Sequence, residues 1–144
     1  MASTQPAARM VLEAATAADL MSPNPKSLNK DSLLSDAVTM MATKGFNAAP
    51  VIDETGRPVG VLSGADVLIH QGESTTAAAE KAPAKVGDLM TPAVFSVTTD
   101  TTADKVVEEM VQLNVHQLYV VDANHTLVGV VTAHDVLRRL HPTV

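Results

Sequence analysis

One stretch of the chain occurs twice, and this duplication limits the folds that it can adopt. Asp19–Pro23 (DLMSP) returns 69 positions later as Asp88–Pro92 (DLMTP). The offset continues without a gap, so that Gly60–Leu68 (GVLSGADVL) aligns with Gly129–Leu137 (GVVTAHDVL). Two gapless copies predict two similar units related by pseudo-symmetry, and a cleft between such units is the natural place for a site.

The composition is that of a globular protein with an aliphatic core. Hydrophobic residues make up 46% of the 144 residues and charged residues 18%, which is too apolar for a disordered chain. With two Phe, one Tyr and no Trp, the core must consist mainly of Val, Leu, Ile, Ala and Met. A single copy of about 50 residues would bury too little surface to be comfortably stable alone, so we expect the copies to pack on each other.

Charge and residue usage exclude several classes of protein. A net charge of −6 argues against a nucleic-acid partner, because phosphate backbones require a basic surface. The absence of cysteine excludes disulfides and thiolate chemistry. No apolar run approaches the ~20 residues of a membrane span, and the N-terminus lacks the apolar stretch of a signal peptide. We therefore expect a cytoplasmic protein with no membrane partner.

Each copy shows the same order of predicted elements. Apolar residues at helical spacing predict one helix near 34–44 and another near 103–113. Each helix is followed by two short apolar runs around a turn, which indicates a β-hairpin, and then by a second helix. A brief strand precedes the first helix, so the unit is β-α-β-β-α, twice, in an α/β fold. We expect Asp31 or Ser32 to cap the first helix and Thr101 with Asp104 the second, with Gly45 and Asn114 at their ends.

The most informative residues are Ser63-x-x-Asp66 and Thr132-x-x-Asp135. Each pair lies where an apolar strand ends and a helix begins. The simpler interpretation is a helix cap with an acidic residue in the first turn. The alternative is a nucleotide site, in which the helix N-terminus and hydroxyl bind phosphate and the carboxylate accepts the hydroxyls of a ribose. Occurrence at the same place in both copies strengthens the second interpretation, although duplication would copy a cap as well.

With these motifs, each copy resembles a cystathionine-β-synthase (CBS) domain, and the chain resembles a tandem CBS pair, or Bateman module. The matching segments are DLMS/TP, the Pro50–Asp53 run, and GVLSGADVL with its twin. The resemblance implies two β-α-β-β-α units that pack as a pair related by a pseudo-two-fold axis. It divides the chain into an N-terminal extension (1–17), a first CBS motif (18–70), a linker (71–85), a second motif (86–140) and a tail (141–144).

The resemblance also implies ligands and residue roles. CBS pairs often bind AMP, ADP or ATP, and sometimes S-adenosylmethionine, in clefts between the motifs. By position, Ser63 and Thr132 would contact phosphate, and Asp66 and Asp135 would contact ribose. The remaining positions expected to face phosphate are Asn47, His116, His134 and Arg138.

The second copy departs from the first in ways that bear on the ligand. It has Tyr119 where the first has Pro50, and the first lacks the usual basic residue near Asn47. Because an acidic protein needs local cations to hold a phosphate, we expect the cleft of Thr132 and Asp135 to be used before that of Ser63 and Asp66. His134 and Arg138 lie four apart and would share a helix face; an exposed polar face is the equally simple alternative.

The predicted function is regulatory. We expect a stand-alone module that binds an adenine nucleotide, forms a homodimer and signals to an effector protein by a change of shape or oligomer. The alternative is a dimerisation scaffold that needs no ligand. No nucleophile elbow or phosphate loop is present, so we expect no enzymatic activity. The five histidines have no ligand-like spacing, so no metal is predicted.

Overall fold

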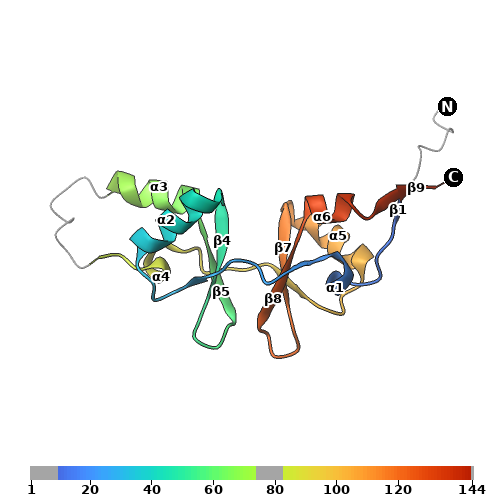
Figure 1. Ribbon diagram of the computed structural model, residues 1–144, viewed down its shortest axis with the longest axis horizontal. Coiled ribbons are helices and arrows are strands. Elements are labelled where there is room, and N and C mark those ends of the chain that lie inside the picture. The colour runs from blue at the N-terminus through green and yellow to red at the C-terminus, as the bar shows by residue number, and fades with distance from the viewer. Residues whose placement is uncertain (1–9, 74–82, 144) are drawn as a thin grey trace. The chain divides into compact units, whose positions relative to one another are not determined.

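The computed structural model (Figure 1) describes residues 10–73 and 83–143. It contains two compact units, and neither corresponds to one sequence copy. Unit 1 comprises the described residues of Met1–Pro25, Ser96–Asn124 and Val128–Val144, and unit 2 comprises those of Lys26–Phe95 and His125–Leu127. The DLMSP segment of the first copy therefore belongs to the unit of the second copy's strands, and DLMTP belongs to the unit of the first copy's strands.

Unit 2 contains the predicted β-α-β-β-α order of the first copy. A three-stranded sheet has the order β3-β4-β5, with β3 parallel to β4 and β4 antiparallel to β5. The hairpin turn between β4 and β5 is closed by Asp53, whose carboxylate accepts hydrogen bonds from Thr55 and Arg57. The elements are β3 (Leu28–Asn29), α2 (Leu34–Lys44), β4 (Ala48–Ile52), β5 (Pro58–Ser63), α3 (Gly64–Glu73) and α4 (Val86–Leu89).

Unit 1 contains the same order from the second copy and adds strands from both ends of the chain. Its four-stranded sheet has the order β2-β8-β7-β6, and β1 pairs with β9 in a separate antiparallel ribbon. The elements are β1 (Met10–Leu12), α1 (Ala17–Leu20), β2 (Ser22–Pro23), β6 (Ser96–Thr98), α5 (Ala103–Leu113), β7 (Gln117–Val121), β8 (Leu127–Thr132), α6 (Ala133–Leu137) and β9 (Leu140–Pro142). The mixed α/β fold and the repeated β-α-β-β-α unit are thus confirmed.

Glycines allow the exchanged segments to lie directly on the strands. Ser22 and Pro23 pair with Val130 and Gly129 of β8. A Cβ built on Gly129 would lie 2.3 Å from the sulfur of Met21, closer than real side chains approach. In unit 2 the equivalent Gly60 faces Met90, whose sulfur would lie 2.6 Å from an added Cβ. An added Cβ would thus collide with a methionine at both glycines, and at Gly60 it would also lie 2.6 Å from the backbone oxygen of Thr91.

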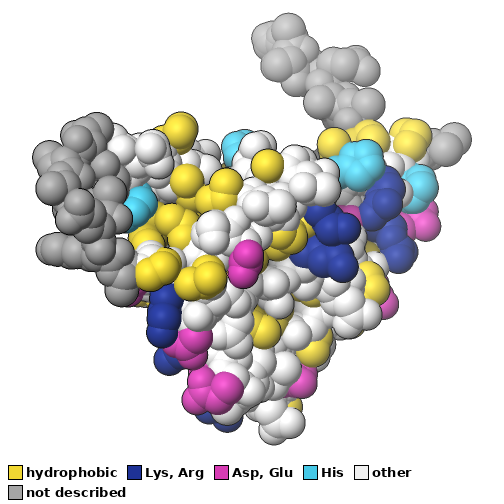
Figure 2. Space-filling view, turned by 60° about the vertical axis from the view of Figure 1, so that its left-hand side comes forward, with side chains coloured by type: hydrophobic (Ala, Val, Ile, Leu, Met, Phe, Trp, Pro, Cys, Tyr) yellow, Lys and Arg dark blue, Asp and Glu magenta, His cyan; other side chains and the backbone are white. Residues whose placement is uncertain are grey.

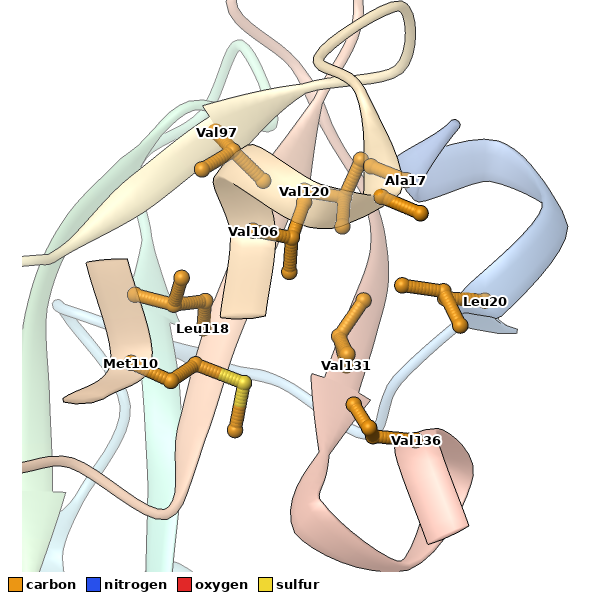
Figure 3. Packing of buried hydrophobic residues seen from close by; sticks show 10 residues of the cluster. Ala17, Leu20, Val97, Val106, Met110, Leu118, Val120, Val131 and Val136 are labelled. Atoms are coloured by element: carbon orange, nitrogen blue, oxygen red, sulfur yellow. The ribbon is translucent and has the colours of Figure 1, made fainter. Parts of the chain in front are cut away.

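Each unit has its own aliphatic core, as the composition predicts. In unit 1, helices α1, α5 and α6 and strands β6, β7 and β8 contribute to one cluster (Figure 3). The fully buried members of this cluster are Ala17, Val106, Leu118, Val120 and Val131. The cluster of unit 2 consists of Leu28, Ala37, Met41, Ala49, Val51, Leu62 and Val86. Tyr119 is the one aromatic side chain among the buried hydrophobic residues of the described chain.

The predicted ends of α2 and α5 are correct, whereas their predicted starts are wrong. Gly45 and Asn114 end α2 and α5 with positive φ angles of 73° and 55°. The N-cap of α2 is Leu33, which makes no side-chain cap, and not Asp31 or Ser32. The N-cap of α5 is Thr102, whose hydroxyl accepts the N–H of Lys105. The hydroxyl of Thr101 instead accepts the N–H of Thr98, which shifts the start of the helix by one residue.

The segments expected to be extension, linker and tail contain regular structure at their edges. Met10–Leu12, within the expected N-terminal extension, is strand β1 and pairs with Leu140–Pro142. The expected linker 71–85 begins within α3 and ends at Lys85, the N-cap of α4. Residues 74–82 of that linker lie outside the described residues. The short helices α1 and α4, at the start of each repeated DLM segment, were not predicted.

Candidate functional site

In unit 2, Ser63 and Asp66 form a reciprocal cap where β5 passes into α3. The Asp66 carboxylate accepts the backbone N–H and the hydroxyl of Ser63 through Oδ2, both at 2.9 Å. The Ser63 hydroxyl oxygen in turn accepts the N–H of Asp66 at 3.1 Å. This is the arrangement that S/T-x-x-D spacing predicts for a helix start. A hydroxyl and a carboxylate are thereby held together at a positive helix end.

In unit 1, Thr132 and Asp135 repeat this geometry where β8 passes into α6. Oδ2 of Asp135 accepts the N–H and the hydroxyl of Thr132 at 2.9 and 3.0 Å, and Asp135 N–H donates to the Thr132 hydroxyl at 3.2 Å. The difference is burial, because Asp135 is 3% exposed and is the one buried charged residue of the described chain, whereas Asp66 is half-buried.

Oδ1 of Asp135 has two more partners. The Ser22 hydroxyl donates to it at 3.0 Å, and the guanidinium of Arg138 forms an ion pair with it from one turn along the chain. A buried carboxylate needs such donors, because an unpaired charge away from water is costly. The side chain of Arg138 is itself 59% exposed. In unit 2, Oδ1 of Asp66 has one described donor, the Thr91 hydroxyl at a longer 3.4 Å.

Asn47 and His116 support the two motifs through their backbones. The carbonyl of Asn47 accepts the N–H of Gly64, the first residue of α3, at 2.9 Å. The carbonyl of His116 accepts the N–H of Ala133, the first residue of α6, at 3.0 Å. Both side chains are exposed, so they are accessible to a ligand. Each residue lies within hydrogen-bonding distance of the helix start in its own unit.

A comparison with protein families identifies the two copies. The CBS domain model matches residues 17–73 and 86–142. The chain belongs to the CBS-domain family. Because the match covers both repeats, the chain is a tandem CBS pair. The two Ser/Thr-x-x-Asp motifs lie at equivalent positions of its two CBS motifs.

Solved structures of CBS pairs have the same fold. The structure of CBSX2 in complex with AMP, a protein of Arabidopsis thaliana, has a TM-score of 0.72 and 29% identity, with coverage of 87% of this chain and 95% of that one. The cytosolic domain of the Mg²⁺ channel MgtE in complex with ATP has a TM-score of 0.71 and 28% identity, with coverage of 88% and 49%.

Curated relatives are larger proteins that contain a similar segment. An inosine-5'-monophosphate dehydrogenase of Methanocaldococcus jannaschii is 29% identical over 112 residues, which cover 78% of this chain. The chain spans 21% of the length of that protein, and 26% and 22% of two further relatives from the same organism. The chain therefore matches only a part of each of these relatives.

Of the predicted phosphate-facing residues in the second CBS motif, the structure brings Arg138 to the site and leaves His134 exposed on α6. The backbone carbonyl of His134 accepts the N–H of Arg138. Arg138 turns toward Asp135, and the joint role of His134 and Arg138 toward a ligand stays a prediction.

Two residues of the CBS motifs were missed at the sequence level. Ser22 and Thr91 donate to Asp135 and Asp66, respectively, and each does so from the DLM segment of the other sequence copy. A signal was present, since a hydroxyl residue occupies the same position of DLMSP and DLMTP. Spacing along the chain could not reveal the exchange of segments between units, because that depends on tertiary pairing.

Tyr119 gives the second CBS motif a buried polar group that the first lacks. Its side chain is 5% exposed, and its hydroxyl accepts a hydrogen bond from the amide of Gln117 at 2.8 Å. Burial raises the pKa of Tyr119 to about 12, because the phenolate is the charged form. In the first motif the same position is Pro50.

Residues 10–73 and 83–143 contain no group of three or more His, Asp or Glu side chains arranged to hold a metal ion. In the same residues, no helix has the length and hydropathy needed to cross a membrane.

Proposed function

We propose that this CBS pair binds an adenine nucleotide at its two Ser/Thr-x-x-Asp motifs and acts as a regulatory module. The observation that carries the proposal is the paired hydroxyl and carboxylate at a strand-to-helix junction in both motifs. The hydroxyls of Ser63 and Thr132 would meet phosphate, and the carboxylates of Asp66 and Asp135 would meet ribose. The similarity to CBSX2 and MgtE, solved with AMP and ATP, supports this ligand class.

The site residues that we propose extend to the neighbouring side chains. Asn47 and His116 are exposed beside the starts of α3 and α6, where they could donate to a phosphate oxygen. Arg138 would add positive charge to the second motif, which an acidic chain needs for an anionic ligand, and His134 would be a further hydrogen-bonding partner. AMP, ADP and ATP fit this arrangement, and S-adenosylmethionine shares its adenosine part.

We further propose that the module works as a homodimer and signals to an effector protein. Its helices expose apolar side chains at equivalent positions of the two CBS motifs, with Leu68 73% and Leu137 64% exposed. Ile69 and Val38 add to the exposed apolar surface of unit 2, where Figure 2 shows hydrophobic side chains gathered over α2 and α3. Exposed apolar patches of this kind are typical of interaction surfaces. A nucleotide must bind one state of the module better than another to change it.

A thermal-shift series tests the binding. AMP, ADP, ATP, S-adenosylmethionine and, as control, GTP are added to the native chain and to Asp66→Asn and Asp135→Asn. A ligand of the folded state raises the melting temperature by mass action. We expect a selective rise with an adenine nucleotide that is reduced in at least one variant. The absence of any response from a folded dimer would favour the alternative function, a scaffold that dimerises without a ligand, for which the exposed Leu68 and Leu137 would be sufficient.

A further inference from the structure

The carboxylate of Asp135 has no acceptor position left for a ligand. An ionised carboxylate offers about four acceptor positions, two on each oxygen. Oδ2 accepts the N–H and hydroxyl of Thr132. Oδ1 accepts the Ser22 hydroxyl and the Arg138 guanidinium. A ribose hydroxyl can therefore donate to Asp135 only after one of these four donors has left.

The carboxylate of Asp66 differs in this respect. Its Oδ2 accepts the same two donors from Ser63, and within the described residues its Oδ1 accepts only the Thr91 hydroxyl, at 3.4 Å. The residue that corresponds to Arg138 is Ile69, which is 62% exposed and cannot donate. Asp66 thus keeps about one acceptor position for an incoming hydroxyl.

Arg138 is the donor of Asp135 that can leave without damage to the fold. The donors from Thr132 belong to the helix cap, and Ser22 lies in β2, which is paired with β8. The side chain of Arg138 is 59% exposed, and the residue is the C-cap of the short helix α6. Its departure nevertheless separates a cation from a buried carboxylate, which is unfavourable unless the guanidinium finds another anion.

We propose that Arg138 makes the second CBS motif selective for phosphorylated adenosines, because a phosphate releases it from Asp135. The inference rests on the proposed function and states which adenosine ligands the second motif prefers. A phosphate gives the guanidinium a new bidentate anionic partner while the ribose takes the vacated position on Asp135. Adenosine offers no such partner, so its binding would leave Arg138 unpaired. The first motif has Ile69 at this position, so no ion pair must separate before a ribose binds Asp66. It therefore discriminates less between AMP and adenosine.

Calorimetric titration of AMP and adenosine tests the inference, one motif at a time. In the Asp66→Asn background, which leaves the second motif intact, we expect AMP to bind about tenfold or more tightly than adenosine, a difference of about 1.4 kcal/mol. Arg138→Met should reduce this ratio to about threefold or less, with weaker AMP binding and stronger adenosine binding. Arg138→Lys keeps a cation and should retain most of the selectivity, which guards against an effect of lost folding.

The matched gain-of-function variant is Ile69→Arg in the Asp135→Asn background. It places an arginine at the equivalent position beside Asp66, and it should increase the preference for AMP over adenosine at the first motif. Equal effects of Arg138→Met on both ligands, or none on either, would overturn the inference while the proposed function stands. Binding of neither ligand to the native chain would overturn this inference, and the additional absence of any thermal shift with ADP, ATP or S-adenosylmethionine would overturn the proposed function.

Discussion

The hydroxyl of Ser22 donates a hydrogen bond to Oδ1 of Asp135 at 3.0 Å, although 113 positions separate the two residues. Ser22 belongs to the first sequence copy and Asp135 to the second. The equivalent pair in unit 2 is Thr91 and Asp66, at 3.4 Å. Each CBS motif is therefore completed by a segment from the other copy, so that neither sequence repeat contains all the residues of its own unit.

Removal of the Ser22 hydroxyl should destabilise the protein. Ser22→Ala takes one donor from a buried carboxylate, and hydrogen bonds to charged groups contribute about 1.5–3 kcal/mol. We expect a loss of about that size in the free energy of unfolding, measured by urea denaturation. Thr91→Val is the matched variant, and it should cost less because its bond to the more exposed Asp66 is longer. Equal losses in both variants would show that the burial of Asp135 does not strengthen the bond.

Gly129→Ala should disturb the contact between β8 and the segment that precedes β2. The new Cβ would lie 2.3 Å from the sulfur of Met21 and 2.9 Å from its Cγ, so the methionine must move. Overpacking of this kind costs about 1–3 kcal/mol, which a urea titration would measure. Met21→Ala in the same chain should recover part of the loss. Gly72→Ala is the control, since nothing lies within 4 Å of its added Cβ; a similar loss there would contradict the steric explanation.

The repeated unit could be predicted because it depends on local sequence. The periodicity of α2 and α5 follows from residues three and four apart, and their ends at Gly45 and Asn114 follow from the left-handed backbone that these residues tolerate. The Ser63–Asp66 and Thr132–Asp135 caps likewise depend on a spacing of three residues. The same patterns do not specify which copy supplies each strand of a sheet.

What the sequence did not reveal depends on contacts between distant residues. Serine is a common helix N-cap, which favoured Ser32. In the structure, however, the carbonyl of Ser32 accepts the N–H of Val86, and its neighbour Leu33 pairs with Lys85. These tertiary bonds place the helix start one residue later. The pairing of β1 with β9 likewise joins Met10–Leu12 to Leu140–Pro142, far along the chain. Neither of these features has a local signature, whereas the ion pair of Arg138 with Asp135 spans only three residues.

The start of α5 offers a direct test of the cap that the structure assigns. Thr102→Ala removes the hydroxyl oxygen that accepts the N–H of Lys105 at 3.3 Å, and loss of an N-cap typically costs about 1 kcal/mol. Thr102→Ser keeps the oxygen and should keep most of the stability. Chemical denaturation of both variants measures the difference. If Ser were as damaging as Ala, the methyl group of Thr102 and not its hydroxyl would be responsible.

The buried Tyr119 should make stability fall in alkali. Its pKa is raised to about 12 in the folded protein, against about 10 for an unfolded chain. The folded state holds the phenolic proton more tightly than the unfolded chain does. The resulting contribution to the free energy of unfolding is fully present below about pH 10 and is lost as the pH rises toward 12. At about pH 11 the expected loss is about 1.4 kcal/mol relative to neutral pH.

Tyr119→Phe isolates this contribution from the other groups that titrate in alkali. The variant lacks the ionisable hydroxyl but also leaves the amide of Gln117 without its partner, so it should be less stable than the native chain at neutral pH. The decisive quantity is the difference in unfolding free energy between the two proteins, measured by urea denaturation at about pH 8 and about pH 11. That difference should shrink by about 1.4 kcal/mol over the interval. A difference that stays constant would mean that the phenol ionises as easily in the folded protein as in the unfolded chain.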